Sequence, residues 1–280
     1  MTRTLHCGRF QLDLGTPRIM GIVNLTDDSF SGDGLHGVSA RAIEQGLRMA
    51  NEGADLLDLG AESSRPGAEP VSVQQELDRL LPVLEGLRGS GVPLSVDTVK
   101  PEVMRAALAG GADLINDISA LQAPGAVEAV AATKAAVCLM HMQGEPRTMQ
   151  ASPHYDDVVE EVRSFLAARV AVCTAAGIAN NRIVIDPGFG FGKTLGHNLD
   201  LLRHLDRFVA TGLPVLVGLS RKSMFGQLTG RPAQERVHAS VAAALLAVQK
   251  GATLVRVHDV AATRDVLAVL AAVKGEHSGA

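Results

Sequence analysis

Eight short apolar segments, each ending in a polar residue or a glycine, restrict what this chain can fold into. They are rich in Val, Ile and Leu, helix-like stretches separate them, and they span residues 19–24, 55–60, 93–97, 113–117, 136–141, 182–186, 214–220 and 253–258. Short segments of this composition are typical of buried parallel strands. Strand and helix alternating eight times predict the α/β class, in the form of a (β/α)8 TIM barrel.

Six polar side chains at or next to the ends of these predicted strands are candidates for one site. In a TIM barrel the carboxyl ends of all strands meet at one face, where active sites form. We therefore expect a single polar mouth built from Asn24, Asp97, Asn116, Asp186, Ser220 and His258. Residues 4–14, with Gly8 at their centre, have the pattern of a short β-hairpin that precedes the barrel and covers its closed end.

Length and composition predict one domain over residues 1–280 and exclude several partners. The length is close to the roughly 250 residues that are typical of this barrel. The longest unbroken apolar stretches, 241–248 and 266–273, are far shorter than the roughly 20 residues that span a bilayer. A net charge of −4 and an aromatic content of 3% argue against binding of nucleic acid. The N-terminus lacks an apolar targeting core, so we expect a cytoplasmic protein with no membrane partner.

Local patterns mark where helices begin and where loops are long. Ser72 and Gln75 have the spacing of a capping box, and Pro101 lies where a first helical residue belongs. Two connections, residues 26–38 and 61–71, are long for turns between a strand and a helix, and they are rich in Gly, Ser, Asp and Pro. Long loops on the active face of a barrel commonly cover or bind the substrate, so we expect lids there.

The last predicted strand directs an arginine and a histidine side chain to one side. Arg256 and His258 are two residues apart, so both point away from the side that Val255 and Val257 occupy. A helix predicted to begin at Asp259 would direct its free amides to the same place. Arginine, histidine and a helix N-terminus together favour an anion such as phosphate or diphosphate. An arginine paired with a carboxylate inside the barrel is the alternative.

Charged residues also lie at or just beyond the ends of three other predicted strands. Lys222 and Ser223 belong to the sequence SRKS after the seventh strand, which is either part of the site or a solvated turn. Asp97 and Asp186 end apolar strands, where an unpaired carboxylate is costly, so each requires a hydrogen-bond donor. A flat heterocycle with neighbouring ring N–H and amino groups would supply such a donor. A lysine or an arginine would do so equally well.

An ordered set of motifs runs through the chain. Eight segments follow one another from Asn24 to Val260: NLTDDSFS, GAESSRPGA, SVDT, NDIS, LMHMQG, DPGFGFGK, GLSRKS and RVHDV. Together they resemble the motifs of the dihydropteroate synthase family, the folate-pathway enzymes that sulfonamides target. Each motif alone is weak, but the ordered set is specific. The sequence departs from the family pattern at Asp27, at residues 32–34 and at Ala61.

The resemblance implies a transferase. Members of the family condense 6-hydroxymethyl-7,8-dihydropterin diphosphate with p-aminobenzoate, and they release dihydropteroate and diphosphate with the assistance of Mg²⁺. The C–O bond to the diphosphate is thought to break first and to leave a pterin methyl cation. Asp97 would stabilise that charge, and an ordered loop would exclude water. The family resemblance, together with the apolar stretches 239–248 and 266–273, also implies a homodimer.

The resemblance further assigns roles to individual residues. The catalytic residues would be Asp97, Lys222, Arg256 and His258. The pterin would lie against Asp97, Asn116, Ile118, Met140, Asp186, Phe191 and Lys222. The diphosphate would be held by Asn24, which would also coordinate the metal, and by Arg65, Arg256 and His258. The p-aminobenzoate would be surrounded by Phe30, Ser64, Arg65, Pro66, Phe191, Lys222 and Ser223.

Two other functions stay open on the sequence alone. A pterin-dependent methyltransferase shares the barrel and the pterin pocket but needs no diphosphate site, so SRKS and RVHDV together count against it. A non-catalytic relative would bind pterin or a protein partner without turnover, and the intact Lys222, Arg256 and His258 count against that interpretation. Release of diphosphate when both substrates and Mg²⁺ are mixed would distinguish the three functions.

Overall fold

Eight parallel strands form the centre of the structure. The computed structural model describes residues 4–25, 34–63 and 70–275. The barrel strands are β3 (Arg18–Asn24), β4 (Leu56–Gly60), β5 (Leu94–Asp97), β6 (Leu114–Asp117), β7 (Ala136–Met140), β8 (Ile183–Asp186), β9 (Leu216–Val217) and β10 (Leu254–Val257). They pair in the order β8-β7-β6-β5-β4-β3-β10-β9, and an isolated bridge between Ile185 and Val215 joins the two ends. The predicted (β/α)8 barrel is confirmed.

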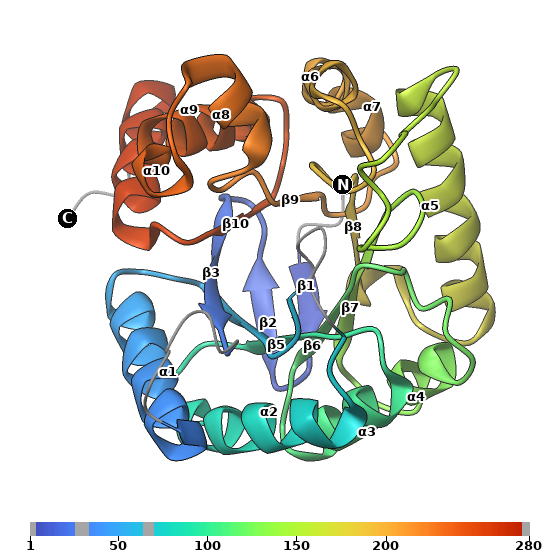
Figure 1. Cartoon of the computed structure of the whole chain (residues 1–280), viewed down its shortest axis with the longest axis vertical. Helices are drawn as coiled ribbons and strands as arrows, with labels where there is room; N and C mark the ends of the chain where they lie inside the picture. Colours follow the sequence, from blue (N-terminus) through green and yellow to red (C-terminus); the bar gives the residue numbers. More distant parts are fainter. Residues whose placement is uncertain (1–3, 26–33, 64–69, 276–280) are drawn as a thin grey trace.

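Helices surround the ring of strands, as Figure 1 shows. In the described part of the chain they are α1 (Gly34–Asn51), α2 (Val73–Leu87), α3 (Pro101–Ala109), α4 (Ala126–Ala131), α5 (Val158–Ala175), α6 (Leu195–Arg203), α7 (Asp206–Val209), α8 (Ser223–Thr229), α9 (Val237–Gln249) and α10 (Val260–Lys274). Two 3₁₀ turns, η2 (Asn180–Arg182) and η3 (Ala233–Glu235), lie between them. Ser72 and Gln75 form the predicted capping box of α2, and Pro101 is the first residue of α3.

Alternating side chains along the strands build two apolar cores. In β10, Val255 and Val257 belong to the large core between barrel and helices, whereas Leu254 belongs to a smaller core inside the barrel. Arg256 therefore lies on the inner side of the sheet, as predicted, because side chains two residues apart share a side. Every residue of β4, β6, β7 and β8 is buried, as expected for strands that are covered on both faces.

The hairpin predicted at the N-terminus closes the amino end of the barrel. Its strands β1 (Thr4–Cys7) and β2 (Phe10–Asp13) pair antiparallel. Leu5 and Cys7 are fully buried in the inner core with residues from the beginnings of the barrel strands. Arg9 adds a salt bridge of 2.9 Å between its Nη2 and Oδ2 of Asp113. The carboxyl end of the barrel is therefore the end at which a ligand can enter.

The seventh barrel strand is shorter than the predicted residues 214–220. Only Leu216 and Val217 are strand, and their ladder partner is β10. The chain leaves the sheet because the following turn is fixed by other contacts: Arg221 adopts a left-handed backbone conformation with φ of +56°, and Ser220 Oγ lies 3.0 Å from Nδ1 of His258. The strand exists at the expected place, but the predicted bounds of 214–220 were too wide.

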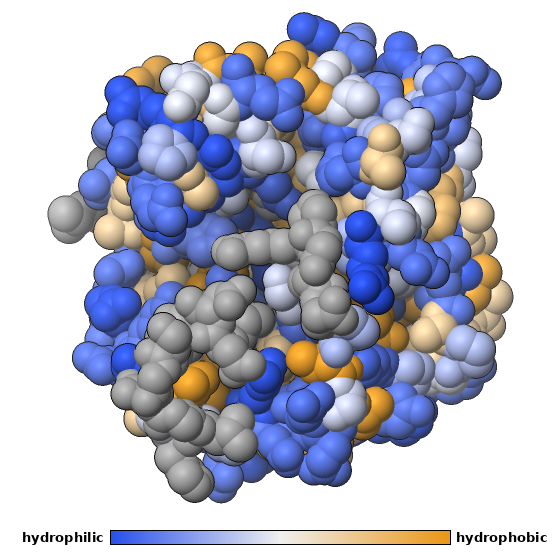
Figure 2. Space-filling model, in the orientation of Figure 1, coloured by the Kyte–Doolittle hydropathy of each residue, from blue (hydrophilic) through white to orange (hydrophobic). Residues whose placement is uncertain are grey.

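The surface is mostly hydrophilic on the face that Figure 2 presents, and this face is hollowed near its centre. In the described part of the chain, no helix is both long enough and apolar enough to cross a membrane. Cys7, Cys138 and Cys173 are buried and form no disulfide.

Candidate active site

Strand register places three predicted residues at one level of the mouth. Asn24 pairs with Gly60, Gly60 pairs with Asp97, and Asp97 pairs with Asn116. Paired residues of neighbouring parallel strands direct their side chains to the same face of the sheet, so Asn24, Asp97 and Asn116 share the inner face. Gly60 has no side chain and leaves room between the first two. Sequence reasoning therefore predicted correctly that these residues converge.

A buried aspartate connects the residues of this group. Asp58 of β4 is fully buried and accepts hydrogen bonds from Ser95 Oγ at 2.5 Å, Asn116 Nδ2 at 3.0 Å and Arg256 Nε at 2.6 Å. Arg256 also places Nη2 3.0 Å from Oδ2 of Asp97. The arginine thus lies between two carboxylates. The structure shows the pairing with carboxylates that the sequence left open for Arg256, and its role in binding an anion stays a prediction.

Asp58 is the residue of this polar group that sequence reasoning missed. The residue stands inside the apolar segment DLLDLG, where a carboxylate is costly unless buried donors surround it. That position inside a predicted strand was the available signal. Its three donors come from distant parts of the chain, and only the closed barrel brings them together.

Burial and neighbouring charges together set the pKa values of Asp97 and Arg256. Desolvation raises the pKa of the Asp97 carboxyl to about 7, although the Arg256 guanidinium opposes the change. Desolvation would lower the pKa of Arg256, but the charges of Asp58 and Asp97 outweigh it and raise that pKa above its ordinary value. The mouth therefore keeps a fixed cation, while Asp97 can gain or lose a proton near neutral pH.

A second polar group lies at the carboxyl ends of β8 and β9. Asp186 is buried and accepts a hydrogen bond of 2.7 Å from the Gly188 amide. Nζ of Lys222 lies 4.2 Å from the centre of the Phe191 ring, which is a cation–π contact. Desolvation raises the pKa of Asp186 to about 6 and lowers the pKa of Lys222 to about 8, and the attraction between the two charges opposes both shifts. A flat polar ligand would find an acceptor, a donor and an aromatic face here.

The turn after β9 brings the predicted SRKS segment to the mouth. Ser220 Oγ accepts a hydrogen bond of 3.2 Å from the His258 amide as well as contacting its ring. Arg221 makes a bidentate salt bridge of 2.6 and 3.1 Å with Asp259, the residue that precedes α10. His258 therefore lies at the N-terminus of a helix, as predicted. Ser223 is exposed and begins α8.

The other predicted site residues fall into two sets. Ile118 and Met140 are buried at the carboxyl ends of β6 and β7. Four residues predicted to bind p-aminobenzoate or diphosphate lie outside the described residues: Phe30, Ser64, Arg65 and Pro66. Most of the two connections in which we expect lids lies there too.

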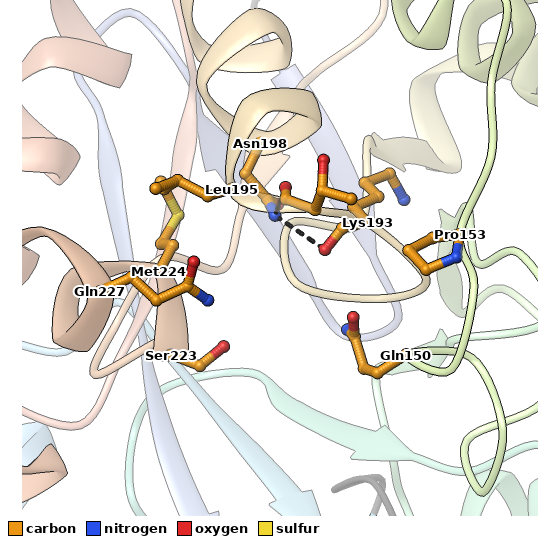
Figure 3. Close-up of a pocket in the computed structure, with 9 residues that line it drawn as sticks. Gln150, Pro153, Lys193, Leu195, Asn198, Ser223, Met224 and Gln227 are labelled. Atoms are coloured by element: carbon orange, nitrogen blue, oxygen red, sulfur yellow. Dashed lines mark hydrogen bonds between the residues drawn. The ribbon is translucent and has the colours of Figure 1, made fainter.

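A cavity of about 250 Å³ adjoins the second polar group (Figure 3). It is lined by Gln150, Pro153, Lys193, Thr194, Leu195, Asn198, Ser223, Met224 and Gln227. Ser223, a residue of the predicted p-aminobenzoate site, lines this cavity together with Leu195 and Asn198 of α6. Its walls offer hydroxyl and amide groups beside short apolar surfaces.

The described residues offer few ligands for a metal ion. They contain no group of three His, Cys, Asp or Glu side chains that could hold one. Asn24 presents an amide group at the carboxyl end of β3. Mg²⁺ usually keeps several waters and binds through one or two protein oxygens together with substrate phosphates. Asn24 therefore fits an ion that is bound mainly by a phosphorylated substrate.

Known proteins are similar in sequence to this chain over nearly its whole length. A family model described as pterin binding enzyme matches residues 20–258. The dihydropteroate synthase of Neisseria meningitidis serogroup B is 54% identical over 271 residues, which cover 94% of this chain and 95% of that protein. The chain belongs to the dihydropteroate synthase family. The dihydropteroate synthase of Escherichia coli K12 is 50% identical over 93% of each chain.

Solved structures of dihydropteroate synthases have the same fold. The Xanthomonas albilineans enzyme with 4-aminobenzoic acid superimposes with a TM-score of 0.92 at 55% identity, covering 98% of this chain and 99% of that chain. The Burkholderia cenocepacia enzyme complexed with 7,8-dihydropteroate gives 0.89 at 52% identity, covering 98% of this chain and 97% of that chain. The Yersinia pestis enzyme in complex with a sulfonamide drug gives 0.92 at 49% identity, covering 97% and 99%. These matches confirm the resemblance inferred from the motifs.

Proposed function

We propose that this chain catalyses the dihydropteroate synthase reaction in folate biosynthesis. It condenses 6-hydroxymethyl-7,8-dihydropterin diphosphate with p-aminobenzoate and releases dihydropteroate and diphosphate, which makes it a transferase. The observation that carries the proposal is the convergence of Asp97, Asn116, Asp186, Lys222 and Arg256 at one barrel mouth in a member of this family. Relatives named above bind 4-aminobenzoic acid or 7,8-dihydropteroate.

The second polar group suits the pterin ring. The Asp186 carboxylate would accept hydrogen bonds from the ring N–H and the amino group, and Asn116 and Lys222 would contact other polar atoms of the ring edge. Ile118, Met140 and Phe191 would pack against its faces. The burial of Asp186 supports this role, because the pterin N–H and amino groups would add donors to the Gly188 amide that already stabilises this buried carboxylate.

The leaving group would depart beside Arg256 of β10 and the neighbouring His258. Arg256, His258 and the N-terminus of α10 lie at this side of the mouth, and Arg65 would join them from the second connection. Asn24 would supply an oxygen ligand to Mg²⁺, and the metal would neutralise charge on the departing diphosphate. Positive groups placed where negative charge grows lower the barrier to breaking the C–O bond.

Asp97 would act through its charge and not as a nucleophile. When the C–O bond breaks, the electron pair leaves with the diphosphate, and the pterin methylene becomes cationic. The Asp97 carboxylate at the mouth would stabilise that cation until the aminobenzoate nitrogen attacks and loses a proton. A substrate-covered mouth would exclude water, which would otherwise capture the cation.

The aminobenzoate would enter from the side of the cavity in Figure 3. Its ring would lie near Phe191 and the Lys222 stem, and Ser223 at the start of α8 would contact its carboxylate. Phe30, Ser64, Arg65 and Pro66 would complete the site from the two long connections. Sulfonamides resemble p-aminobenzoate, and a related enzyme has been solved with such a drug, so we expect sulfonamides to bind here.

A coupled assay tests the function directly. The purified chain, both substrates and Mg²⁺ should yield equimolar dihydropteroate and diphosphate, and Asp97→Asn should abolish the yield while retaining pterin binding. Absence of diphosphate release by the wild-type chain would refute the proposal. A parallel reaction with methyltetrahydrofolate and a corrinoid acceptor should show no methyl transfer; transfer there would point to the methyltransferase function.

We also propose a homodimer in the cytoplasm. Leu246 of α9 and Val269 and Val273 of α10 are exposed, although these two helices are apolar and pack on each other. Apolar side chains concentrated on one pair of helices favour burial against a second copy. Three buried cysteines without a disulfide suit a reducing compartment.

A further inference from the structure

The glycine-rich loop after β8 packs through its backbone. Gly188, Gly190 and Gly192 have positive φ angles of 73°, 80° and 60°. A Cβ on Gly188 would overlap the carbonyl oxygen of His141, and a Cβ on Gly192 would overlap that of Gln143. The loop is therefore pressed against the segment that follows β7, with no space for side chains between the two backbones.

One buried ammonium group lies between these two segments. Lys193 is only 3% exposed, and its Nζ lies 2.9 Å from the carbonyl oxygens of Gly188 and Phe191. Nζ also lies 3.0 Å from Nδ1 and 3.3 Å from the carbonyl oxygen of His141. An ammonium has three N–H donors for these four acceptors, whereas a neutral amine has only two.

The acceptors around this cation are all neutral. His141 accepts through Nδ1, and burial together with the Lys193 charge lowers the pKa of the His141 ring to about 3, so the ring stays uncharged. Desolvation lowers the pKa of Lys193 to about 7, although the Asp186 carboxylate opposes this change. In the part of the chain that the structure describes, no carboxylate forms a salt bridge with Lys193. A buried cation without a salt bridge is costly, which indicates a role beyond packing.

We propose that Lys193 is a positioning residue of the active site, an inference that rests on the function proposed above. By binding carbonyl groups at both ends of the loop, it fixes Phe191, whose ring lies against Lys222. It also fixes Gly188, whose amide donates to Asp186. Lys193 thereby holds Asp186, which would bind the pterin edge, and Phe191, which would cover the pterin face, in a fixed relative position. It does so without contacting the substrate.

Other contacts keep the loop in place when Lys193 is replaced. The Tyr155 hydroxyl donates to the Gly192 carbonyl at 2.9 Å, and Gln150 Nε2 donates to the Gly190 carbonyl at 2.5 Å. We therefore expect Lys193 variants to fold. Tyr155 is the only tyrosine of the chain and there is no tryptophan, so near-ultraviolet circular dichroism reports on the far side of this loop.

A chemical test separates the charge of Lys193 from its bulk. Lys193 is one of the residues that line the cavity of Figure 3, where its carbonyl oxygen accepts a hydrogen bond from Asn198. Lys193→Ala should bind the pterin diphosphate at least about tenfold more weakly than the wild type, since a charge-assisted hydrogen-bond set is lost. Calorimetry without aminobenzoate measures this affinity. Propylammonium, which replaces the deleted atoms and the charge, should restore most of the affinity. Propanol has the same shape without the charge and should restore none.

Two further variants complete the experiment. Lys193→Met keeps the aliphatic stem but lacks the ammonium, so it should lose affinity to the same extent and should not respond to propylammonium. Lys134→Ala removes an exposed lysine between α4 and β7 and should bind like the wild type. Loss of the near-ultraviolet signal of Tyr155 in Lys193→Ala would indicate that the loop has moved. The pterin affinity of Lys193→Met then decides the test.

Wild-type affinity in Lys193→Met would overturn the proposal, and so would rescue of Lys193→Ala by propanol as strong as rescue by propylammonium. Because the readout is binding, it is separate from turnover. A wild-type chain that binds the pterin but releases no diphosphate with aminobenzoate would refute the proposed function. The affinities of the variants would still test the positioning role of Lys193. A wild-type chain that binds no pterin would refute both.

Discussion

Asp186 ends its strand where only 5% of its surface reaches solvent. Desolvation raises the pKa of its carboxyl to about 6, even though the Gly188 amide and nearby cations stabilise the charged form. The folded chain therefore holds a proton on Asp186 between the ordinary pKa of aspartate and pH 6, where the unfolded chain has lost it. The charged carboxylate costs stability above pH 6, and this cost disappears as the pH falls toward 4.

Replacing Asp186 by asparagine should therefore stabilise the fold at alkaline pH. Asp186→Asn keeps an acceptor for the Gly188 amide but carries no charge, so we expect its free energy of unfolding to exceed that of the wild type by on the order of 2 kcal/mol at pH 8. The difference should close between pH 6 and pH 4. Urea denaturation at a series of pH values, followed by far-ultraviolet circular dichroism, measures it.

An exposed aspartate provides the matched control for this substitution. Asp265→Asn on α10 should leave the free energy of unfolding nearly unchanged at every pH. Asp186→Asn should also bind pterin more weakly than the wild type, because its NH2 group is a donor where the carboxylate has a second acceptor oxygen. Equal stability of wild type and Asp186→Asn at pH 8 would contradict the charge cost.

Individual residues of the mouth could be predicted only in part. Asp97, Asn116 and Asp186 follow apolar strands, so their position at the mouth depends on strand direction alone. The pairing of Arg256 with Asp58 joins residues 198 positions apart, and local sequence contains no signal for such a distant partner. The sequence therefore predicts the place of Arg256 but leaves its partner open.

At the scale of elements, the N-terminal hairpin depends on a single turn residue. Gly8 has φ of +56°, and a Cβ there would lie 2.5 Å from Oδ1 of Asp113 and 2.8 Å from its Cα. Asp113 in turn binds Arg9 and the Leu94 amide. The turn thus seats the hairpin against the beginning of β6.

Gly8→Ala should therefore detach the hairpin from the barrel. We expect a loss of about 2 to 3 kcal/mol in the free energy of unfolding, from backbone strain together with the forced movement of Asp113. Gly89→Ala is the control, since a Cβ at Gly89 meets nothing within 4 Å. Thermal and urea denaturation compare the two variants. A Gly8→Ala chain as stable as Gly89→Ala would show that the hairpin contributes little.

Elements with local signals were predicted better than elements fixed by tertiary contacts. Ser72 and Gln75 form the capping box within one helical turn, so four consecutive residues contain the whole signal. The end of the seventh strand depends instead on Ser220 contacting His258 and on Arg221 pairing with Asp259, both 38 residues away. No local sequence pattern marks the end of this strand, so the predicted strand was longer than the observed one.

At the scale of the whole molecule, the exposed apolar side chains of α9 and α10 lead to a prediction about assembly. Val269→Asp places a charge at a side chain that is 65% exposed, so it should convert the proposed dimer to a monomer without unfolding it. Light scattering after size-exclusion chromatography at micromolar concentration measures the mass. Val172→Asp on α5, at 44% exposure, should stay dimeric. A wild-type mass of one chain would refute the dimer.

The ring of strands is held by seven ladders and, between β8 and β9, by one isolated bridge. That join separates Asp186 and Phe191 on one flank from Lys222 on the other. A pterin that contacts both flanks would link β8 to β9, where the fewest backbone hydrogen bonds join the barrel strands. Backbone amides beside the join should exchange with deuterium early in the free chain and slow down the most once the ligand is bound. The bound pterin would then stabilise the same part of the barrel that forms its binding site.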